Sequence, residues 1–199
     1  MKRGWGEGNM PELFIIAGCN GAGKTTAAYN LLPSVFQTAE FVNADELARG
    51  INADNVESAA FAAGKLMLKK VHSLIESRAD FALETTLSGQ SYINIVKRAK
   101  SLGYKFTLFF VYLPSSTMAI ERVALRVVKG GHNIPKEVIE RRYGKGVKNL
   151  PKFMALADCW FILDNSIEFE MVAEYFDDKQ RINNFELFKK LTGDESDKY

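Results

Sequence analysis

The stretch Gly18-Cys19-Asn20-Gly21-Ala22-Gly23-Lys24-Thr25 fits the pattern G-x-x-x-x-G-K-[ST] of a phosphate-binding loop, or P-loop. Residues 13–17 before it form a short apolar run that suits a buried strand, and residues 26–32 after it can be helical until Pro33. This order of strand, glycine loop and helix is the setting in which the pattern holds the phosphates of a nucleotide. The sequence therefore predicts a site for a nucleoside triphosphate, and we expect ATP.

Each residue type in the loop has a physical reason to be there. Glycine reaches backbone angles that turn several N–H groups toward one anion, and the start of the helix adds partial positive charge. Lys24 supplies a full charge for the β- and γ-phosphates and is counted as catalytic, while Thr25 supplies an oxygen ligand to Mg²⁺. The predicted ATP-binding residues of this segment are Gly18, Asn20, Gly21, Ala22, Gly23, Lys24, Thr25 and Thr26.

The composition of the chain indicates a single domain. Its 199 residues are 47% hydrophobic, which is ample for a packed core, and the net charge of +2 implies no general attraction to nucleic acid or to a membrane surface. Cys19 and Cys159 lack metal-site spacing, so we expect free thiols in a reducing, cytoplasmic compartment. No apolar run approaches the ~20 residues that span a membrane, and residues 1–11 are expected to be a flexible lead-in.

Apolar patterns along the rest of the chain predict alternating strands and helices. Further strands are expected at 41–43, 81–83, 105–113 and 159–163, and helices at 55–78, 90–102, 117–129 and 136–150. This alternation indicates a three-layer α/β/α fold of the P-loop NTPase type, with a five-stranded, mainly parallel sheet and helices on both faces. The kinase-like domain is expected to span 12–165, and residues 166–199 to form an extension packed on it, with a last strand and a helix near 185–191.

Polar side chains follow the second and third predicted strands, at the edge of the sheet where ligands of such folds bind. They are Asn43, Asp45, Glu84 and Thr85, which we predict to bind the substrate. Asp45 can also accept a proton from a hydroxyl that attacks the γ-phosphate, hold Mg²⁺ through water, or cap a helix. Glu84 can bind a substrate hydroxyl or form a strand-end salt bridge. Asp45 is the predicted catalytic base.

The two helices after Pro114 carry basic side chains that suggest a lid over about 115–149. Arg122 and Arg126 lie on one stripe of the first helix. On the second helix, Arg142 flanks the buried face and Arg141 points away from it. Arginines of mobile segments neutralise the charge that develops in phosphoryl transfer, so we predict Arg126 and Arg142 to be catalytic and Arg122 to contact ATP. The alternative is a solvated basic face.

The loop between these two helices holds Gly130-Gly131, a candidate hinge, followed by His132. The imidazole of His132 either touches the substrate, which is our prediction, or closes the loop with a hydrogen bond. The chain has no cysteine and histidine cluster that would indicate zinc.

Four pieces of the sequence, in this order, resemble the zeta-toxin family of P-loop kinases, in its chromosomal, single-domain branch. They are 18–25, 41–45, 81–87, and 130–135 with Arg141-Arg142-Tyr143 after it, and together they cover about residues 13–165. The resemblance implies ATP- and Mg²⁺-dependent phosphorylation of a hydroxyl on a small molecule, which in zeta toxins is a UDP-linked N-acetylamino sugar such as UDP-N-acetylglucosamine.

The resemblance also implies roles for single residues. By position, Asp45 looks like the family's catalytic base and Glu84 like its substrate-binding carboxylate. Arg122 is similar in position to the first of two phosphate-contacting arginines, and the second is Arg126, Arg141 or Arg142.

Three other functions compete with a small-molecule kinase. The first is a toxin whose behaviour depends on a separate antitoxin protein. The second is a kinase of nucleic-acid ends, which the net charge of +2 disfavours because phosphate contacts need a basic track. The third is a non-catalytic nucleotide-binding module, which the presence of Lys24, Asp45 and Glu84 argues against. We expect neither nucleic acid nor a membrane as a partner.

Overall fold

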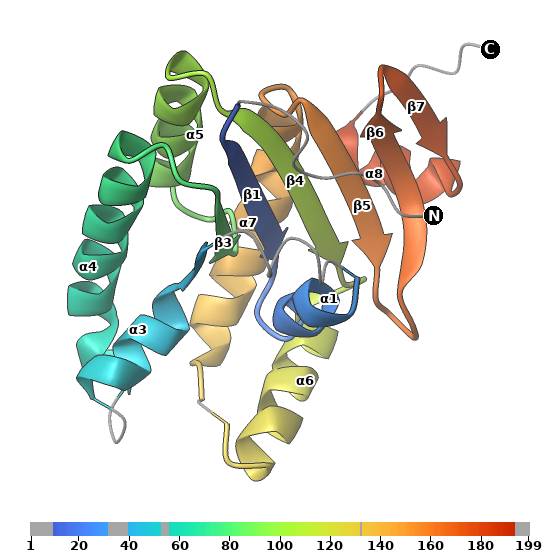
Figure 1. Ribbon diagram of the computed structural model, residues 1–199. Coiled ribbons are helices and arrows are strands. Elements are labelled where there is room, and N and C mark those ends of the chain that lie inside the picture. The colour runs from blue at the N-terminus through green and yellow to red at the C-terminus, as the bar shows by residue number, and fades with distance from the viewer. Residues whose placement is uncertain (1–9, 32–39, 53–55, 132, 194–199) are drawn as a thin grey trace.

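The computed structural model describes residues 10–31, 40–52, 56–131 and 133–193, and Figure 1 shows their arrangement. Most of the predicted lead-in, and His132, lie outside these residues. The strands are β1 Glu12–Gly18, β2 Glu40–Asn43, β3 Phe81–Thr85, β4 Lys105–Tyr112, β5 Cys159–Asp164, β6 Glu170–Phe176 and β7 Lys179–Ile182. The helices are α1 Lys24–Leu31, α3 Ala44–Ile51, α4 Val56–Glu76, α5 Ser91–Ser101, α6 Ser116–Val128, α7 Lys136–Met154 and α8 Phe185–Thr192.

The strands form one sheet in the order β2-β3-β1-β4-β5-β6-β7. The first five strands in this order pair in parallel, and β6 and β7 add to the edge in antiparallel pairing. The fold class is as predicted, but the sheet has seven strands and the prediction of five was wrong. The two extra strands join through Asp177 and Asp178, which both have φ of 55° and so suit a tight hairpin. All four residues of β7 are exposed, so this strand lacks the apolar pattern that sequence analysis detects.

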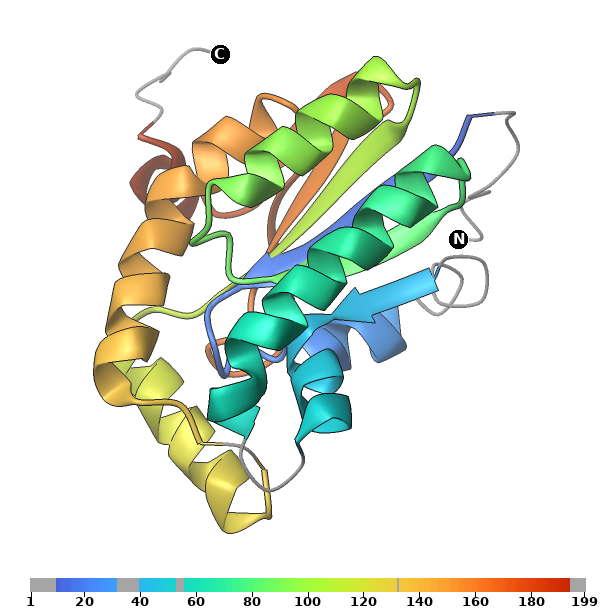
Figure 2. The same cartoon turned by 90° about the vertical axis from the view of Figure 1, so that its left-hand side faces the viewer.

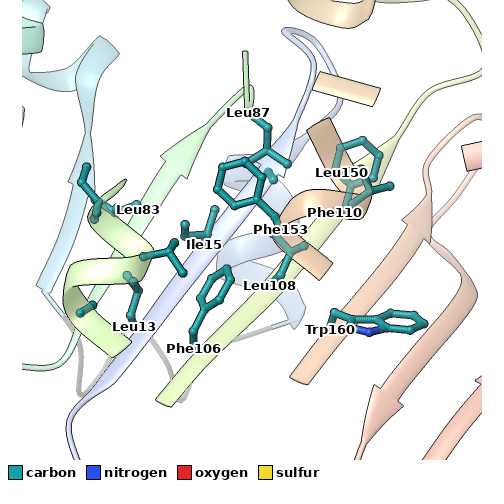
Figure 3. Packing of buried hydrophobic residues seen from close by; sticks show 14 of the residues in the cluster. Leu13, Ile15, Leu83, Leu87, Phe106, Leu108, Phe110, Leu150, Phe153 and Trp160 are labelled. Atoms are coloured by element: carbon teal, nitrogen blue, oxygen red, sulfur yellow. The ribbon is translucent and has the colours of Figure 1, made fainter. Parts of the chain in front are cut away.

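Helices cover the two faces of the sheet unequally (Figures 1 and 2). Helices α4, α5, α7 and α8 pack on one face, and α1 lies on the other. The larger core lies under the four helices, and Figure 3 shows side chains from β1, β3 and β4 there, packed with Leu150 and Phe153 of α7. Burial of each such side chain stabilises the fold by about 1.5–3 kcal/mol. The predicted three layers are therefore present.

Helix α7 runs four residues beyond its predicted end at Leu150, through Pro151 to Met154. Proline normally ends a helix because it lacks an N–H and its ring crowds the preceding turn. Here Leu150 and Phe153 on either side of it are completely buried, so packing overrides the local signal. Among the helices that the structure describes, α7 included, none is long and apolar enough to cross a membrane.

The register of the central strands brings the ends of β1, β2 and β3 together. Ile16 of β1 is level with Glu84 of β3, and Asn43 of β2 is level with the same glutamate. On the other side, Gly18 lies beside Val111 of β4, so close that a Cβ on Gly18 would be 2.3 Å from the Val111 carbonyl oxygen. The predicted gathering of functional groups at one edge follows from this register.

Candidate active site

The P-loop lies at the carboxyl end of β1 and packs against helix α6 and the loop after β5. Gly21 and Gly23 have φ of 77° and 85°, which favour glycine. A Cβ on Gly21 would be 2.8 Å from the carbonyl oxygen of Ala119 in α6. A Cβ on Gly23 would be 2.6 Å from Nδ2 of Asn165, in the loop after β5. The glycines therefore allow close packing, in addition to their predicted role in phosphate binding.

Lys24 is the first residue of α1, and its side chain folds back over the loop. Its Nζ donates to the Cys19 carbonyl oxygen at 3.1 Å and lies 3.5 Å from Oε1 of Glu84. Only 7% of the residue is exposed, so the ammonium group is held beside the loop. This is the position in which a lysine meets the β- and γ-phosphates of a nucleotide.

Glu84, at the end of β3, connects the P-loop to the neighbouring strand. The Thr25 hydroxyl donates to its Oε2 at 2.8 Å, and Nδ2 of Asn43 donates to the same oxygen at 3.1 Å. With Lys24 on Oε1, one carboxylate thus joins three residues from two other elements. The sequence predicted a substrate-binding or ion-paired Glu84. The structure shows the ion pair, together with a contact to the predicted metal ligand.

The oxygens of Thr25 and Glu84 fit a site for Mg²⁺. This ion prefers oxygen ligands, and it is usually held by one or two protein groups, by the phosphates of the substrate and by water. The described part of the chain has no group of three or more histidine, cysteine, aspartate or glutamate side chains that would hold a metal ion unaided. A hydroxyl next to a carboxylate at the phosphate loop is the smaller donor set that a nucleotide-borne Mg²⁺ needs.

For two predicted site residues, Asp45 and His132, the structure describes only the main chain or nothing at all. Asp45 is the second residue of α3, directly after β2, but its side chain lies outside what the structure describes. Its backbone follows Asn43, which contacts Glu84, so the main chain of Asp45 is at the same edge of the sheet. His132 lies outside the described residues altogether.

The structure brings two of the predicted arginines to the P-loop. Arg122 of α6 is half-buried, donates to the Ser166 carbonyl oxygen at 2.9 Å, and has its Cβ 3.2 Å from where a Cβ on Gly21 would lie. Arg142 of α7 is also half-buried and donates to Oδ1 of Asn20 at 3.5 Å, a long hydrogen bond. Arg141, its neighbour, is exposed, which agrees with the predicted helix faces.

Arg126 is placed differently from Arg122. It lies one turn later in α6, about 6 Å further along the helix. Its carbonyl oxygen accepts from Gly131 N at 2.9 Å, and a Cβ on Gly131 would be 2.5 Å from its Cγ. These contacts are with the turn between α6 and α7.

The remaining predicted residues differ in burial. Thr26 is exposed in the first turn of α1, and Ala22 is buried. Thr85 is buried, and its hydroxyl accepts from Leu87 N at 3.1 Å, so it organises the segment after β3.

The sequence analysis missed Asn165, whose Nδ2 donates to the Ala22 carbonyl oxygen at 2.9 Å. Because Asn165 directly follows β5, the rule that ligands bind beyond strand ends would have selected it.

The thiol of Cys19 lies inside the P-loop and is buried. Burial raises its pKa from 9.0 to about 11, and the nearby charge of Lys24 offsets only part of that effect. The thiol is therefore neutral at physiological pH. Burial and the neighbouring Tyr112 likewise raise the pKa of Tyr143, whose hydroxyl donates to the Leu113 carbonyl oxygen at 2.9 Å.

A P-loop on a parallel sheet of order β2-β3-β1-β4-β5 defines a P-loop kinase fold, and solved structures share it. The AvrRxo1-ORF1:-ORF2 structure with ATP aligns with a TM-score of 0.75 at 21% identity, over 94% of this chain and 64% of that chain. The PezAT chromosomal toxin-antitoxin structure of Streptococcus pneumoniae aligns with a TM-score of 0.68 at 17% identity, over 96% and 81% of the respective chains. The present chain thus spans less than two thirds of the AvrRxo1 chain that it matches.

The chain belongs to the Zeta toxin family, whose model matches residues 2–168. It is also 33% identical over 134 residues to an uncharacterized protein of Haemophilus influenzae, a match that covers 66% of this chain and 92% of that protein. The family membership that the four sequence pieces predicted is confirmed.

Proposed function

We propose that the protein is an ATP-dependent kinase that phosphorylates a hydroxyl group of a small molecule. The observation that carries this proposal is the position of the Glu84 carboxylate, 2.8 Å from the Thr25 hydroxyl and 3.5 Å from Lys24. It joins the groups that hold phosphate to the strand end beyond which an acceptor binds. The structural relative named above was solved with ATP, which supports ATP as the phosphoryl donor.

The proposed reaction is a direct transfer. The acceptor hydroxyl oxygen forms a bond to the γ-phosphorus, the bond from that phosphorus to the β,γ-bridging oxygen breaks, and ADP leaves with the electron pair. Asp45 takes the hydroxyl proton, while Lys24 and the arginines Arg122 and Arg142 neutralise the phosphate charge. Mg²⁺, when bound to the phosphates with Thr25 and Glu84 beside it, supplies further positive charge. Asn43 and Glu84 face the acceptor side.

We infer the acceptor class from family membership: a nucleotide sugar such as UDP-N-acetylglucosamine. The test is an ATP-consumption screen against nucleotide sugars, free sugars and nucleosides, with the product identified by its added phosphate mass. Lys24→Ala is the control, because it removes the positive charge that is proposed to meet the β- and γ-phosphates. ATP consumption that Lys24→Ala leaves unchanged would contradict the proposal.

A second proposal concerns a protein partner. The family model is that of a toxin, and one structural relative is named as a toxin-antitoxin system. We infer that induced expression of this chain inhibits growth and that a separate antitoxin protein relieves the inhibition. Expression of wild type against Lys24→Ala tests this, since toxicity that depends on phosphoryl transfer disappears in the variant. Equal growth of cells expressing either protein and of cells carrying the empty vector would overturn it.

A further inference from the structure

Three unusual features meet in the segment that follows Glu84. Leu87 has φ of 55°, a left-handed conformation that is costly for leucine, although its side chain is completely buried. Gly146 lies inside α7, where glycine weakens a helix, and a Cβ there would be 2.5 Å from the Thr86 carbonyl oxygen. Asn149 of α7 is 5% exposed and donates to the Leu87 carbonyl oxygen at 2.8 Å. The segment is thus held in a strained shape by α7.

The same face of α7 also reaches the P-loop. Arg142, Gly146 and Asn149 are separated by four and three residues, which places them within about 60° of one another around the helix. Arg142 donates to Oδ1 of Asn20, and the other two residues touch the main chain two and three residues after Glu84. Leu87, Leu150 and Phe153 belong to one apolar cluster, which fixes α7 against this segment (Figure 3). One face of α7 therefore contacts both the P-loop and the segment that follows Glu84.

We propose that Gly146 and Asn149 are positioning residues, which set the place of the Glu84 carboxylate on Thr25 and Lys24 by clamping Thr86 and Leu87. The inference rests on the proposed function, because ATP binding with Mg²⁺ is where the position of Glu84 matters. The clamp explains why a glycine and a buried asparagine occupy α7, two features that helix formation itself disfavours. Neither residue is expected to touch ATP or the acceptor.

The test compares two glycines of the same helix. Gly146→Ala forces the Thr86 carbonyl away, whereas a Cβ on the exposed Gly144 has no neighbour within 4 Å. Binding of a fluorescent ATP analogue is titrated at varied Mg²⁺. Gly146→Ala should raise the Mg²⁺ concentration for half-maximal binding by about tenfold, the lower end of the effect of moving a group that supports a metal ligand. Gly144→Ala should match wild type.

A double-mutant cycle separates positioning from general damage to the fold. If Gly146 acts through Glu84, then Gly146→Ala has no further effect on the Mg²⁺ requirement of a Glu84→Gln protein. If the double variant raises the Mg²⁺ requirement by the product of the two single increases, the two residues act independently and the proposal is overturned. A folded Gly146→Ala protein with the wild-type Mg²⁺ requirement would also overturn it. Wild-type protein that does not bind the ATP analogue at any Mg²⁺ concentration would instead contradict the proposed function, which is a distinguishable result.

Asn149→Leu provides a second variant should Gly146→Ala fail to fold. It keeps the side-chain size but removes the donor to the Leu87 carbonyl oxygen. We expect a rise of about threefold in the Mg²⁺ requirement, smaller than for Gly146→Ala because nothing is pushed aside. We also expect faster hydrogen exchange at the Leu87 amide without any ligand, since that amide donates within the clamped segment. Exchange and Mg²⁺ requirement both equal to wild type would overturn the proposal.

Discussion

Glu84 has two kinds of neighbour, and they imply different effects of its removal. Toward the P-loop its carboxylate accepts from Thr25 and pairs with Lys24, and toward the predicted acceptor side it accepts from Asn43. Its side chain is 11% exposed, so these contacts form with little competition from water. We therefore expect the charge of Glu84 to affect the binding of Mg²⁺ and nucleotide, in addition to its predicted contact with the acceptor.

We predict that Glu84→Gln raises the Mg²⁺ requirement of ATP binding by about 10–100-fold, the usual cost of losing a group that orients a metal ligand. The amide keeps the shape of the side chain but cannot pair with the Lys24 ammonium group. Equilibrium binding of ATP at several Mg²⁺ concentrations measures the change. A variant with a wild-type Mg²⁺ requirement and a raised KM for the acceptor would assign the carboxylate to the acceptor alone.

Asp45→Asn should behave in the opposite way. As a general base, Asp45 contributes about 10²–10⁴-fold to turnover, and the amide cannot accept the proton. ATP affinity should stay nearly unchanged, because the phosphates are held by the loop and Lys24. Steady-state kinetics with varied Mg²⁺ separates the alternatives: recovery of the rate at high Mg²⁺ would make Asp45 a metal-binding group, and a wild-type rate would make it a helix cap.

The Cys19 thiol predicts how stability depends on pH. Its pKa is about 11 in the folded protein against 9.0 as the ordinary value, so the folded chain keeps a proton that the unfolded chain releases between these values. The stabilising effect is complete below pH 9 and is lost as pH rises toward 11. Urea unfolding should show the free energy of unfolding falling by up to about 1.4 kcal/mol per pH unit for this group.

Cys19→Ala removes the titrating group and is the matched comparison. Its free energy of unfolding should fall less steeply than that of wild type between pH 9 and pH 11. Between pH 7 and pH 8 the Cys19 thiol is mostly protonated in both the folded and the unfolded wild-type chain, so the difference in free energy of unfolding between wild type and Cys19→Ala should be nearly constant. Parallel curves above pH 9 would mean that the folded thiol titrates normally.

At the scale of elements, α6 is attached to the rest of the site through its first half, whereas α7 has buried side chains near both of its ends, Ile139 and Phe153. Ser115 caps α6 by accepting from Met118 N at 3.1 Å, and Ala119 and Val123 of this helix are buried. Helix α7 is attached through Tyr143 and Asn149. The far part of α6 is more open, with Leu125 63% and Val128 86% exposed, and Figure 1 shows it projecting beyond the sheet.

We therefore predict that lid motion is concentrated in residues 124–131, within the 115–149 segment that the sequence suggested. Hydrogen exchange should slow most in that inner segment when a non-hydrolysable ATP analogue and Mg²⁺ bind. Peptides from 143–153 should change little, because they are already packed on the core. An equal slowing of hydrogen exchange across 115–149, or no slowing, would contradict this location of the lid motion.

Elements with strong local signals were predictable from the sequence. The helices α4, α5 and α6 have regular apolar spacing, and their bounds agree with the predicted ones within two residues; α5 also ends near Gly103, and α6 begins after Pro114. Strand β7 has no buried side chain and α7 continues through a proline, and both depend on tertiary packing that a local pattern does not carry.

Some features of the candidate site were likewise predictable from the sequence, and others were not. The strand-end rule predicted that Asn43 and Glu84 lie near the P-loop, which the structure shows. The direct contact of Glu84 with Thr25 was not predictable, because it requires the register that sets Glu84 level with Ile16. The sequence predicted phosphate roles for Arg122, Arg126 and Arg142, but the contacts that Arg122 and Arg142 make depend on where α6 and α7 cross the P-loop, which no local pattern shows.

At the scale of the whole molecule, the segment after β5 is part of the same structural unit as the site. Strand β6 pairs with β5, and Phe188 of α8 stacks on Trp160 of β5 with ring centroids 5.8 Å apart. Two residues of the loop between β5 and β6 contact the site. Asn165 donates to the P-loop at Ala22, and the Ser166 carbonyl oxygen accepts from Arg122. We therefore expect a loss of packing in α8 to affect β5, the strand that ends at the P-loop contact.

We predict that Phe188→Ala lowers the free energy of unfolding by about 3–5 kcal/mol, the range for truncating a buried aromatic side chain. Phe188 is 4% exposed and belongs to the main core under the sheet, so the substitution leaves a cavity beside Trp160. Ile167→Ala is the control: Ile167 is 93% exposed, and its truncation should change stability by less than about 0.5 kcal/mol. Urea unfolding followed by tryptophan fluorescence and by circular dichroism should give coincident single transitions for both proteins. A first transition that releases only the C-terminal segment, with ATP binding retained, would show that residues 166–193 fold separately from the P-loop domain.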